Sequence, residues 1–150
     1  MRTVIQRVKN AAVEIDGKIH NEIRTGLLVL IGVCEEDNGE DIDWLCRKIV
    51  NLRIFDDENG VMNKSILDMK GDILMVSQFT LWASCKKGNR PSYIRAGRHE
   101  ITVPIYERTC QKLSEMLGKE IKTGVFGADM KVKLLNDGPV TIYIDTKNRE

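Results

Sequence analysis

The sequence predicts one α/β domain spanning residues 1–150, a layered α/β/β arrangement with mixed, partly barrel-like sheets and two helices packed on one side. Three observations predict this fold. Strand-like segments separated by turn residues occupy both ends of the chain. Two segments between them place apolar residues at helical spacing. A chain of 150 residues that is 42% hydrophobic, with no linker or internal repeat, is long enough for one hydrophobic core.

The N-terminal part of the chain predicts three strands. Residues 4–8 and 12–15 form the first two, and the second runs into Asp16-Gly17, a strong signal for a hairpin turn. The run from Leu27 to Cys34 is apolar on both faces, which is typical of a central strand buried from both sides.

Two helices are predicted from apolar residues that recur every three or four positions. The first follows the polar loop at residues 35–41, and the second ends at Gly118, a good residue to close a helix. Pro104 is expected in the first turn of the second helix, where a missing N–H is tolerated. The apolar positions are Ile42, Leu45, Cys46 and Ile49 in the first helix, and Val103, Tyr106, Cys110, Leu113 and Leu117 in the second.

The remaining strands are short and separated by turns. Turns are expected at residues 56–60 and 70–72, and a buried strand is expected over residues 73–79. Near the C-terminus, residues 130–135 and 140–144 alternate as strands around a predicted turn at residues 136–139.

Composition excludes several classes of protein. With 23 cationic and 22 anionic side chains, the chain does not coat nucleic acid or membranes by bulk charge. Its four cysteines are scattered, without the close pairs of a zinc site, and no apolar run is long enough to cross a bilayer. Because no secretory leader precedes the first strand, we expect a cytoplasmic protein with reduced thiols, no bound metal, no cofactor and no membrane partner.

A conventional nucleophile is poorly supported. Ser77, Thr80 and Ser84 offer hydroxyl groups, but each needs a base to activate it, and the only histidines are His20 and His99. A Ser-His-Asp arrangement is therefore the minor hypothesis, and no glycine-rich phosphate loop is present. Two other segments stand out, namely Ser77–Leu81 at the end of a buried strand and Asn136–Thr141 around a Gly-Pro. Judged by spacing alone, the first is an ordinary strand end and the second an ordinary tight turn.

Taken together and in order, seven segments give the chain a close resemblance to the D-aminoacyl-tRNA deacylase family. They are MRTVIQRV, GLLVLIGV, NLRIF, VSQFTL, KKGNRPS, TGVFGADMKV and NDGPVT, which span nearly the whole chain. Residues 96–103 depart from the family, because they lack the acidic, proline-containing entry to the second helix.

The resemblance implies a homodimeric hydrolase with its active site at the subunit interface. It would cleave the ester of D-aminoacyl-tRNA, and of glycyl-tRNA mischarged on alanine tRNA, to give free tRNA and amino acid. Ser77, Gln78, Phe79 and Thr80 would line the pocket for the terminal adenosine and the aminoacyl group. Gly138 and Pro139 of the partner subunit would reach in through a cis Gly-Pro corner that Arg7 helps to hold.

The resemblance also implies a mechanism that needs few catalytic side chains. The 2′-hydroxyl of the terminal ribose would assist hydrolysis, and a neighbouring group in the right geometry is worth ~7–11 kcal/mol of barrier. Backbone N–H groups near Phe79 and Thr80 would stabilise the oxyanion. Thr80 as a covalent nucleophile ranks lower, because no base is evident beside it. The rigid Gly-Pro corner would reject L-amino acids sterically.

A basic loop supplies the expected contact with tRNA. Five cationic residues and no acid lie between Lys86 and Arg98, and we expect Lys86, Lys87 and Arg90 to bind acceptor-end phosphates with a shallow salt dependence. Three alternatives remain: a relative that edits L-alanine on threonine tRNA, a non-catalytic nucleic-acid-binding module, and a generic serine or cysteine hydrolase. The SQF sequence at residues 77–79 disfavours the first, the lack of a basic extension the second, and the missing base the third.

Overall fold

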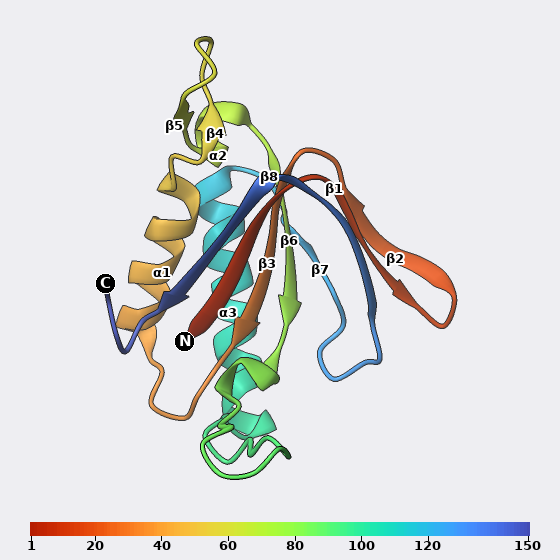
Figure 1. Cartoon of the computed structure of the whole chain (residues 1–150), viewed down its shortest axis with the longest axis vertical. Helices are drawn as coiled ribbons and strands as arrows, with labels where there is room; N and C mark the ends of the chain where they lie inside the picture. Colours follow the sequence, from red (N-terminus) through yellow and green to blue (C-terminus); the bar gives the residue numbers. More distant parts are fainter.

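A computed structural model describes all residues, 1–150, and shows one sheet of six strands with helices on one face (Figure 1). The strand order is β2-β1-β3-β6-β7, and β8 also pairs with β1. A separate hairpin, β4–β5, projects from one end. The strands are β1 (Arg2–Ile15), β2 (Lys18–Ile23), β3 (Gly26–Gly32), β4 (Phe55–Asp56), β5 (Met62–Lys64), β6 (Asp72–Ser77), β7 (Lys122–Thr123) and β8 (Lys131–Asp145). The helices are α1 (Gly39–Asn51), α2 (Ile66–Met69), the 3₁₀ helix η1 (Phe79–Trp82) and α3 (His99–Leu117).

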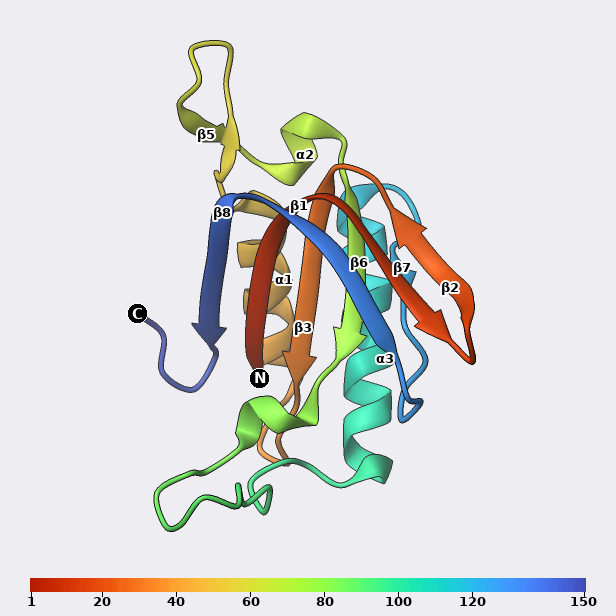
Figure 2. The same cartoon turned by 45° about the vertical axis from the view of Figure 1, so that its right-hand side comes forward.

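Two core clusters explain the layers. Along β3 and β6, alternate residues such as Leu27 and Ile73 pack with α1 and α3, because successive side chains of a strand point to opposite faces. The intervening residues, Leu28, Leu74 and Val76, join a second cluster with residues of β1 and β2. The curved sheet therefore encloses apolar residues on its far side as well, which confirms the layered, partly barrel-like fold with two helices on one side (Figures 1 and 2).

The first strand is longer than predicted. Two strands were expected over residues 4–8 and 12–15, whereas β1 runs without interruption from Arg2 to Ile15. Lys9 and Asn10 break the apolar pattern because they are exposed, yet pairing with β8 continues past them through shifts in register. The Asp16-Gly17 hairpin turn is confirmed, with φ angles of 50° and 75°.

The predicted turn at residues 136–139 is wrong as a hairpin. The two halves of β8 do not pair with each other, since both pair with β1, from Glu14↔Lys131 to Arg2↔Asp145. The ribbon instead bends sharply over one end of the sheet at this point (Figure 1). Residues 136–140 therefore form a corner within one long strand, with Gly138 and Pro139 exposed at its tip.

Two further boundaries differ from prediction. The buried strand expected to reach Phe79 ends at Ser77, because η1 begins at Phe79 and the Leu81 N–H bonds to the Gln78 carbonyl (3.2 Å). The second helix begins at His99, so Pro104 is its sixth residue and not part of the first turn as expected. No helix is long and apolar enough to cross a membrane.

Candidate active site

A cavity of about 440 Å³ opens where the parallel strands β3 and β6 end. Ligands commonly bind at the carboxyl ends of such strands, because the chain leaves the sheet there and exposes polar groups. The walls come from the end of β6, the first turns of α3 and the segment before β8. The polar or aromatic lining residues include Ser77, Gln78, Phe79, His99, Thr102, Tyr106, Phe126 and Asp129.

Of the residues expected from the SQFTL segment, three line this cavity. Ser77, Gln78 and Phe79 face it, whereas Thr80 does not line it. The Thr80 hydroxyl accepts a hydrogen bond from Gln78 Nε2 at 2.6 Å, so the two side chains hold each other. The Phe79 ring is 56% exposed at the rim of the cavity.

Two backbone donors beside the cavity are unused. Phe79 and Thr80 open η1, and the first N–H groups of a helix have no partner within it. Neither group donates to any other backbone or side-chain acceptor, although the preceding Gln78 N–H bonds to the Ile31 carbonyl at 2.7 Å. Both N–H groups therefore have no acceptor within the protein.

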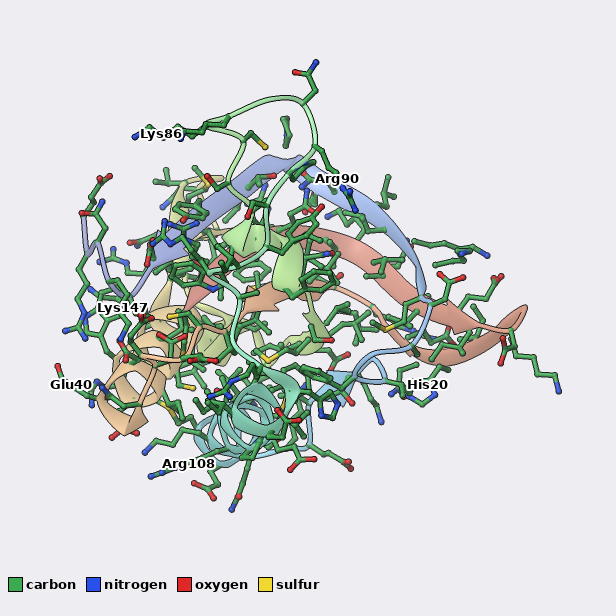
Figure 3. The ribbon with its side chains drawn as sticks, turned by 90° about the horizontal axis from the view of Figure 1, so that it is seen from below. His20, Glu40, Lys86, Arg90, Arg108 and Lys147 are labelled. Carbon is green, nitrogen blue, oxygen red and sulfur yellow. The ribbon has the colours of Figure 1, made fainter.

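The structure offers no conventional nucleophile and base. No hydrogen bond joins Ser77, Thr80 or Ser84 to either histidine, and His20 lies on the exposed strand β2 (Figure 3). Burial raises the pKa of the Cys46 thiol to about 12 and that of Cys110 to about 11, so neither is a thiolate near neutral pH. These facts disfavour a serine hydrolase, and a cysteine hydrolase that uses Cys46 or Cys110.

An aromatic wall beside the cavity was not predicted from the sequence. The ring of Phe126 lies edge-on to His99 (5.3 Å between centroids) and to Tyr106 (5.6 Å). Tyr106 donates its hydroxyl to the Met75 carbonyl at 3.0 Å, which ties α3 to β6 beneath the cavity. The helical spacing of Tyr106 indicated only a core position, and nothing in the sequence indicated that His99 faces the same cavity.

The Gly138-Pro139 corner is exposed but firmly held. Its peptide bond is cis, and Gly138 has a φ of 148°, which favours glycine. The Arg7 guanidinium donates to the Asp137 carbonyl (2.8 Å) and the Ile54 carbonyl (2.6 Å), and the Arg7 side chain is only 8% exposed. The amide of Asn136, whose role was not predicted, bonds to both the N–H (2.9 Å) and the carbonyl (3.0 Å) of Val140.

The corner and the cavity lie at opposite ends of the sheet (Figures 1 and 2). Asn136 pairs with Val8, Val8 with Gly26, and Gly26 with Asp72 at the start of β6. Ser77 is at the other end of β6, roughly 16 Å away at ~3.3 Å per residue. A single chain therefore keeps its two conspicuous segments apart.

Strand β1 is tied to both ends. Arg7 holds the corner, and Arg2 reaches the cavity end, where its guanidinium donates to the Leu81 carbonyl (3.1 Å) and to Asp145 (2.9 Å). The same guanidinium lies 4.0 Å above the buried ring of Trp82. The role of Arg2 was not predicted either, because no motif marks this residue.

Some cations of the basic loop have partners within the protein, and others have none. Arg98 pairs with Glu35 (2.7 Å), and Arg95 lies 5.1 Å from the Trp82 ring. Lys86, Lys87 and Arg90 have no ion pair and no side-chain hydrogen bond. In Figure 3, Lys86 and Arg90 project from opposite sides of the loop. No group of three histidine, cysteine or carboxylate side chains is placed to hold a metal ion.

Comparison with known proteins decides the family. The family model described as D-Tyr-tRNA(Tyr) deacylase matches residues 4–145. Proteins named D-aminoacyl-tRNA deacylase from Bacteroides fragilis and Flavobacterium psychrophilum are 68% and 59% identical, each over the full length of both chains. The chain belongs to the D-aminoacyl-tRNA deacylase family. It is therefore a hydrolase that acts on D-aminoacyl-tRNA.

Solved structures agree with the deacylase fold. The structure of a protein named c-Myc DNA Unwinding Element Binding Protein has a TM-score of 0.92 and 40% identity, covering 97% of this chain and 98% of that one. A second structure, of a probable eukaryotic D-amino acid tRNA deacylase, has a TM-score of 0.82 over 95% of this chain and 97% of that one. At 16% identity, the second likeness shows the fold alone.

Proposed function

We propose that this deacylase is a cytoplasmic proofreading enzyme of translation, a homodimer whose two active sites each combine the cavity of one subunit with the Gly138-Pro139 corner of the other. The observation that carries the proposal is the separation of these features at opposite ends of one chain. A two-fold axis brings the corner of each copy to the cavity of the other, because such an interface pairs the same two surfaces twice.

Hydrolysis in the proposed site depends on the substrate's own 2′-hydroxyl. A water molecule attacks the ester carbonyl carbon to give a tetrahedral intermediate. As the bond from this carbon to the 3′ oxygen breaks, one proton of the water passes by way of the 2′-hydroxyl to the 3′ oxygen and regenerates the ribose hydroxyl. The other proton leaves with the amino acid, whose carboxyl group ionises in solvent. The free N–H groups of Phe79 and Thr80 are suited to the developing oxyanion, since neither has a competing acceptor in the protein. The absence of a paired base beside Thr80 favours this route over covalent catalysis.

Chiral selection rests on the corner. A Cβ added at Gly138 would lie 2.7 Å from Val140 Cγ2 and 2.8 Å from the Val140 nitrogen, so the corner has no room for a side chain at this residue. With Arg7 and Asn136 fixing it from both sides, the corner is a rigid wall that an L side chain meets and a D side chain avoids. Glycine has no side chain to exclude, so glycyl-tRNA mischarged on alanine tRNA is a substrate too.

The proposal is tested by release of amino acid from D-tyrosyl-tRNA, L-tyrosyl-tRNA and glycyl-tRNA. The unaltered enzyme is expected to release D-tyrosine and glycine but not L-tyrosine. Gly138→Ala is expected to lose activity or discrimination, whereas Gly17→Ala, which shares a positive φ without a close contact, is expected to keep both. Complete inertness of glycyl-tRNA would overturn exclusion as the basis of selection.

The shared site has its own test. Co-expression of Gly138→Ala with Phe79→Ala gives mixed dimers in which one of the two sites has an intact cavity and an intact corner. If each variant alone is inactive, about a quarter of the normal activity should return, since about half the dimers are mixed. No recovery, or a monomeric mass in solution, would contradict a site built across two subunits.

A further inference from the structure

An exposed pair of aromatic rings lies at the edge of the cavity, and only one of the two, Phe79, belongs to the proposed active site. Phe79 at the rim and Tyr93 outside it are 5.1 Å apart between centroids at an angle of 70°. Both are well exposed, Phe79 at 56% and Tyr93 at 39%. An edge-to-face pair leaves ring faces open to solvent, and an exposed aromatic pair with free faces is suited to stacking on another planar group.

The position of Tyr93 is fixed by the basic loop. Ser84 and Ser92 exchange two backbone hydrogen bonds (2.8 and 3.0 Å), so the intervening residues close on themselves and Tyr93 emerges directly beside Phe79. The loop's unpaired cations, Lys86, Lys87 and Arg90, lie on the segment that this bridge closes. No carboxylate lies between Lys86 and Arg98 to compete for them.

Exposed aromatic rings beside unpaired cations are the combination with which proteins bind single-stranded nucleic acid, because bases stack on the rings and phosphates contact the cations. We propose that Tyr93, with Phe79, forms a stacking site for the unpaired nucleotide that precedes the terminal adenosine of the tRNA. The unpaired cations of the loop then contact the phosphates of the same unpaired strand, Arg90 from one side of the loop and Lys86 from the other. This inference rests on the proposed function, which places the terminal adenosine in the cavity that Phe79 borders.

The site is tested with two small substrates that share the reactive ester: the D-tyrosyl ester of adenosine and that of the trinucleotide CCA. The unaltered enzyme should prefer the trinucleotide. Tyr93→Ala should reduce kcat/KM on the trinucleotide by roughly 5- to 100-fold, the range typical of losing one base–aromatic stack, and leave the adenosine ester within about twofold. Tyr93→Phe keeps a ring and should retain the preference. Tyr143→Ala, which removes a 55% exposed tyrosine on β8, should change neither substrate.

Four outcomes would overturn the stacking site. Equal losses on both esters would mean that Tyr93 only supports Phe79, and no loss on either would mean that it contacts nothing. A change of molar mass in Tyr93→Ala would mean that the aromatic pair belongs to the contact between copies. Failure of the unaltered enzyme on both esters and on D-tyrosyl-tRNA would overturn the proposed function itself, whereas activity on all three with no preference for the trinucleotide would reject the stacking site alone.

Discussion

The two ends of the sheet treat their polar groups in opposite ways. At the corner, Arg7 and Asn136 occupy the carbonyls of Ile54, Asp137 and Val140, and the Val140 N–H is bonded as well. At the cavity, the N–H groups of Phe79 and Thr80 have no acceptor, and the Phe79 ring is exposed. The corner therefore presents a fixed shape, whereas the cavity end leaves two backbone donors without an acceptor in the protein. Changes at the corner should therefore cost stability, and changes to the exposed rim of the cavity, such as Phe79, should cost activity alone.

The largest effect is expected from Arg7→Ala. The nearly buried guanidinium satisfies two carbonyls, so its loss leaves both without a donor and should lower the free energy of unfolding by roughly 2–4 kcal/mol. Denaturation in urea measures this value. Lys9→Ala is the matched control, since Lys9 also reaches Asp137 (3.1 Å) but is 57% exposed, and it should change stability by no more than about 1 kcal/mol. Equal effects would show that charge opposite Asp137 holds the corner, and not the bonds from Arg7.

Asn136→Ala should have a smaller effect of the same kind. It removes two hydrogen bonds to Val140, which together are worth about 1–2 kcal/mol of unfolding free energy. Asn136→Asp keeps the acceptor for the Val140 N–H but loses the donor to the Val140 carbonyl. Its free energy of unfolding should therefore lie between those of the unaltered protein and Asn136→Ala. If both variants unfold like the unaltered protein, the corner does not depend on this amide.

Acid should have a smaller effect, because it weakens the contacts of Asp145 at the cavity end but not the bonds that hold the corner. Burial opposes ionisation of Asp145, but the Lys147 N–H and the Arg2 guanidinium outweigh it and hold its pKa below the ordinary 3.8. This stabilisation is complete above pH 3.8 and is lost as the pH falls through the lowered pKa. The bonds of Arg7 to carbonyls do not titrate. Unfolding free energy measured between pH 2 and 6 should fall less steeply in Asp145→Asn, and an unchanged slope would contradict a role for this carboxylate.

Phe79→Ala should have the smallest effect on stability. Because more than half of the ring is exposed, the free energy of unfolding should change by no more than about 0.5 kcal/mol. Release of D-tyrosine from its tRNA should nevertheless fall sharply, because Phe79 borders the cavity. A large loss of stability would show that the cavity end is as tightly built as the corner.

The helices and the central strands could be predicted because local patterns determine them. The spacing of Ile42, Leu45 and Ile49 places one face of α1 in the core, and the Asp16-Gly17 pair alone forms the hairpin turn. The continuity of β8 could not be predicted. A Gly-Pro between two alternating segments suggests a hairpin turn, and only the pairing of both halves with β1 makes it a corner.

The candidate site was predictable in part, and only through the family resemblance. That resemblance supplied Ser77, Gln78, Phe79 and Arg7, whereas residue spacing favoured a strand end and a simple turn. Asn136 lies in a segment that was singled out, but a simple turn gives its amide no particular role. Arg2 and His99 were missed because their positions depend on neighbours distant in sequence: Arg2 reaches Leu81, and His99 meets Phe126. Local patterns carry no information about such contacts.

Strand β1 also sets the distance between the corner and the cavity end. Arg2 anchors η1 at the cavity end and Arg7 anchors the corner, so five residues of one extended strand determine how far apart the two features lie. Inserting or deleting a residue between them would turn every following side chain to the other face of the sheet, so Arg7 would no longer reach the corner. In the proposed dimer, this distance would affect both active sites. The N-terminal strand should therefore tolerate changes of residue type far better than changes of length.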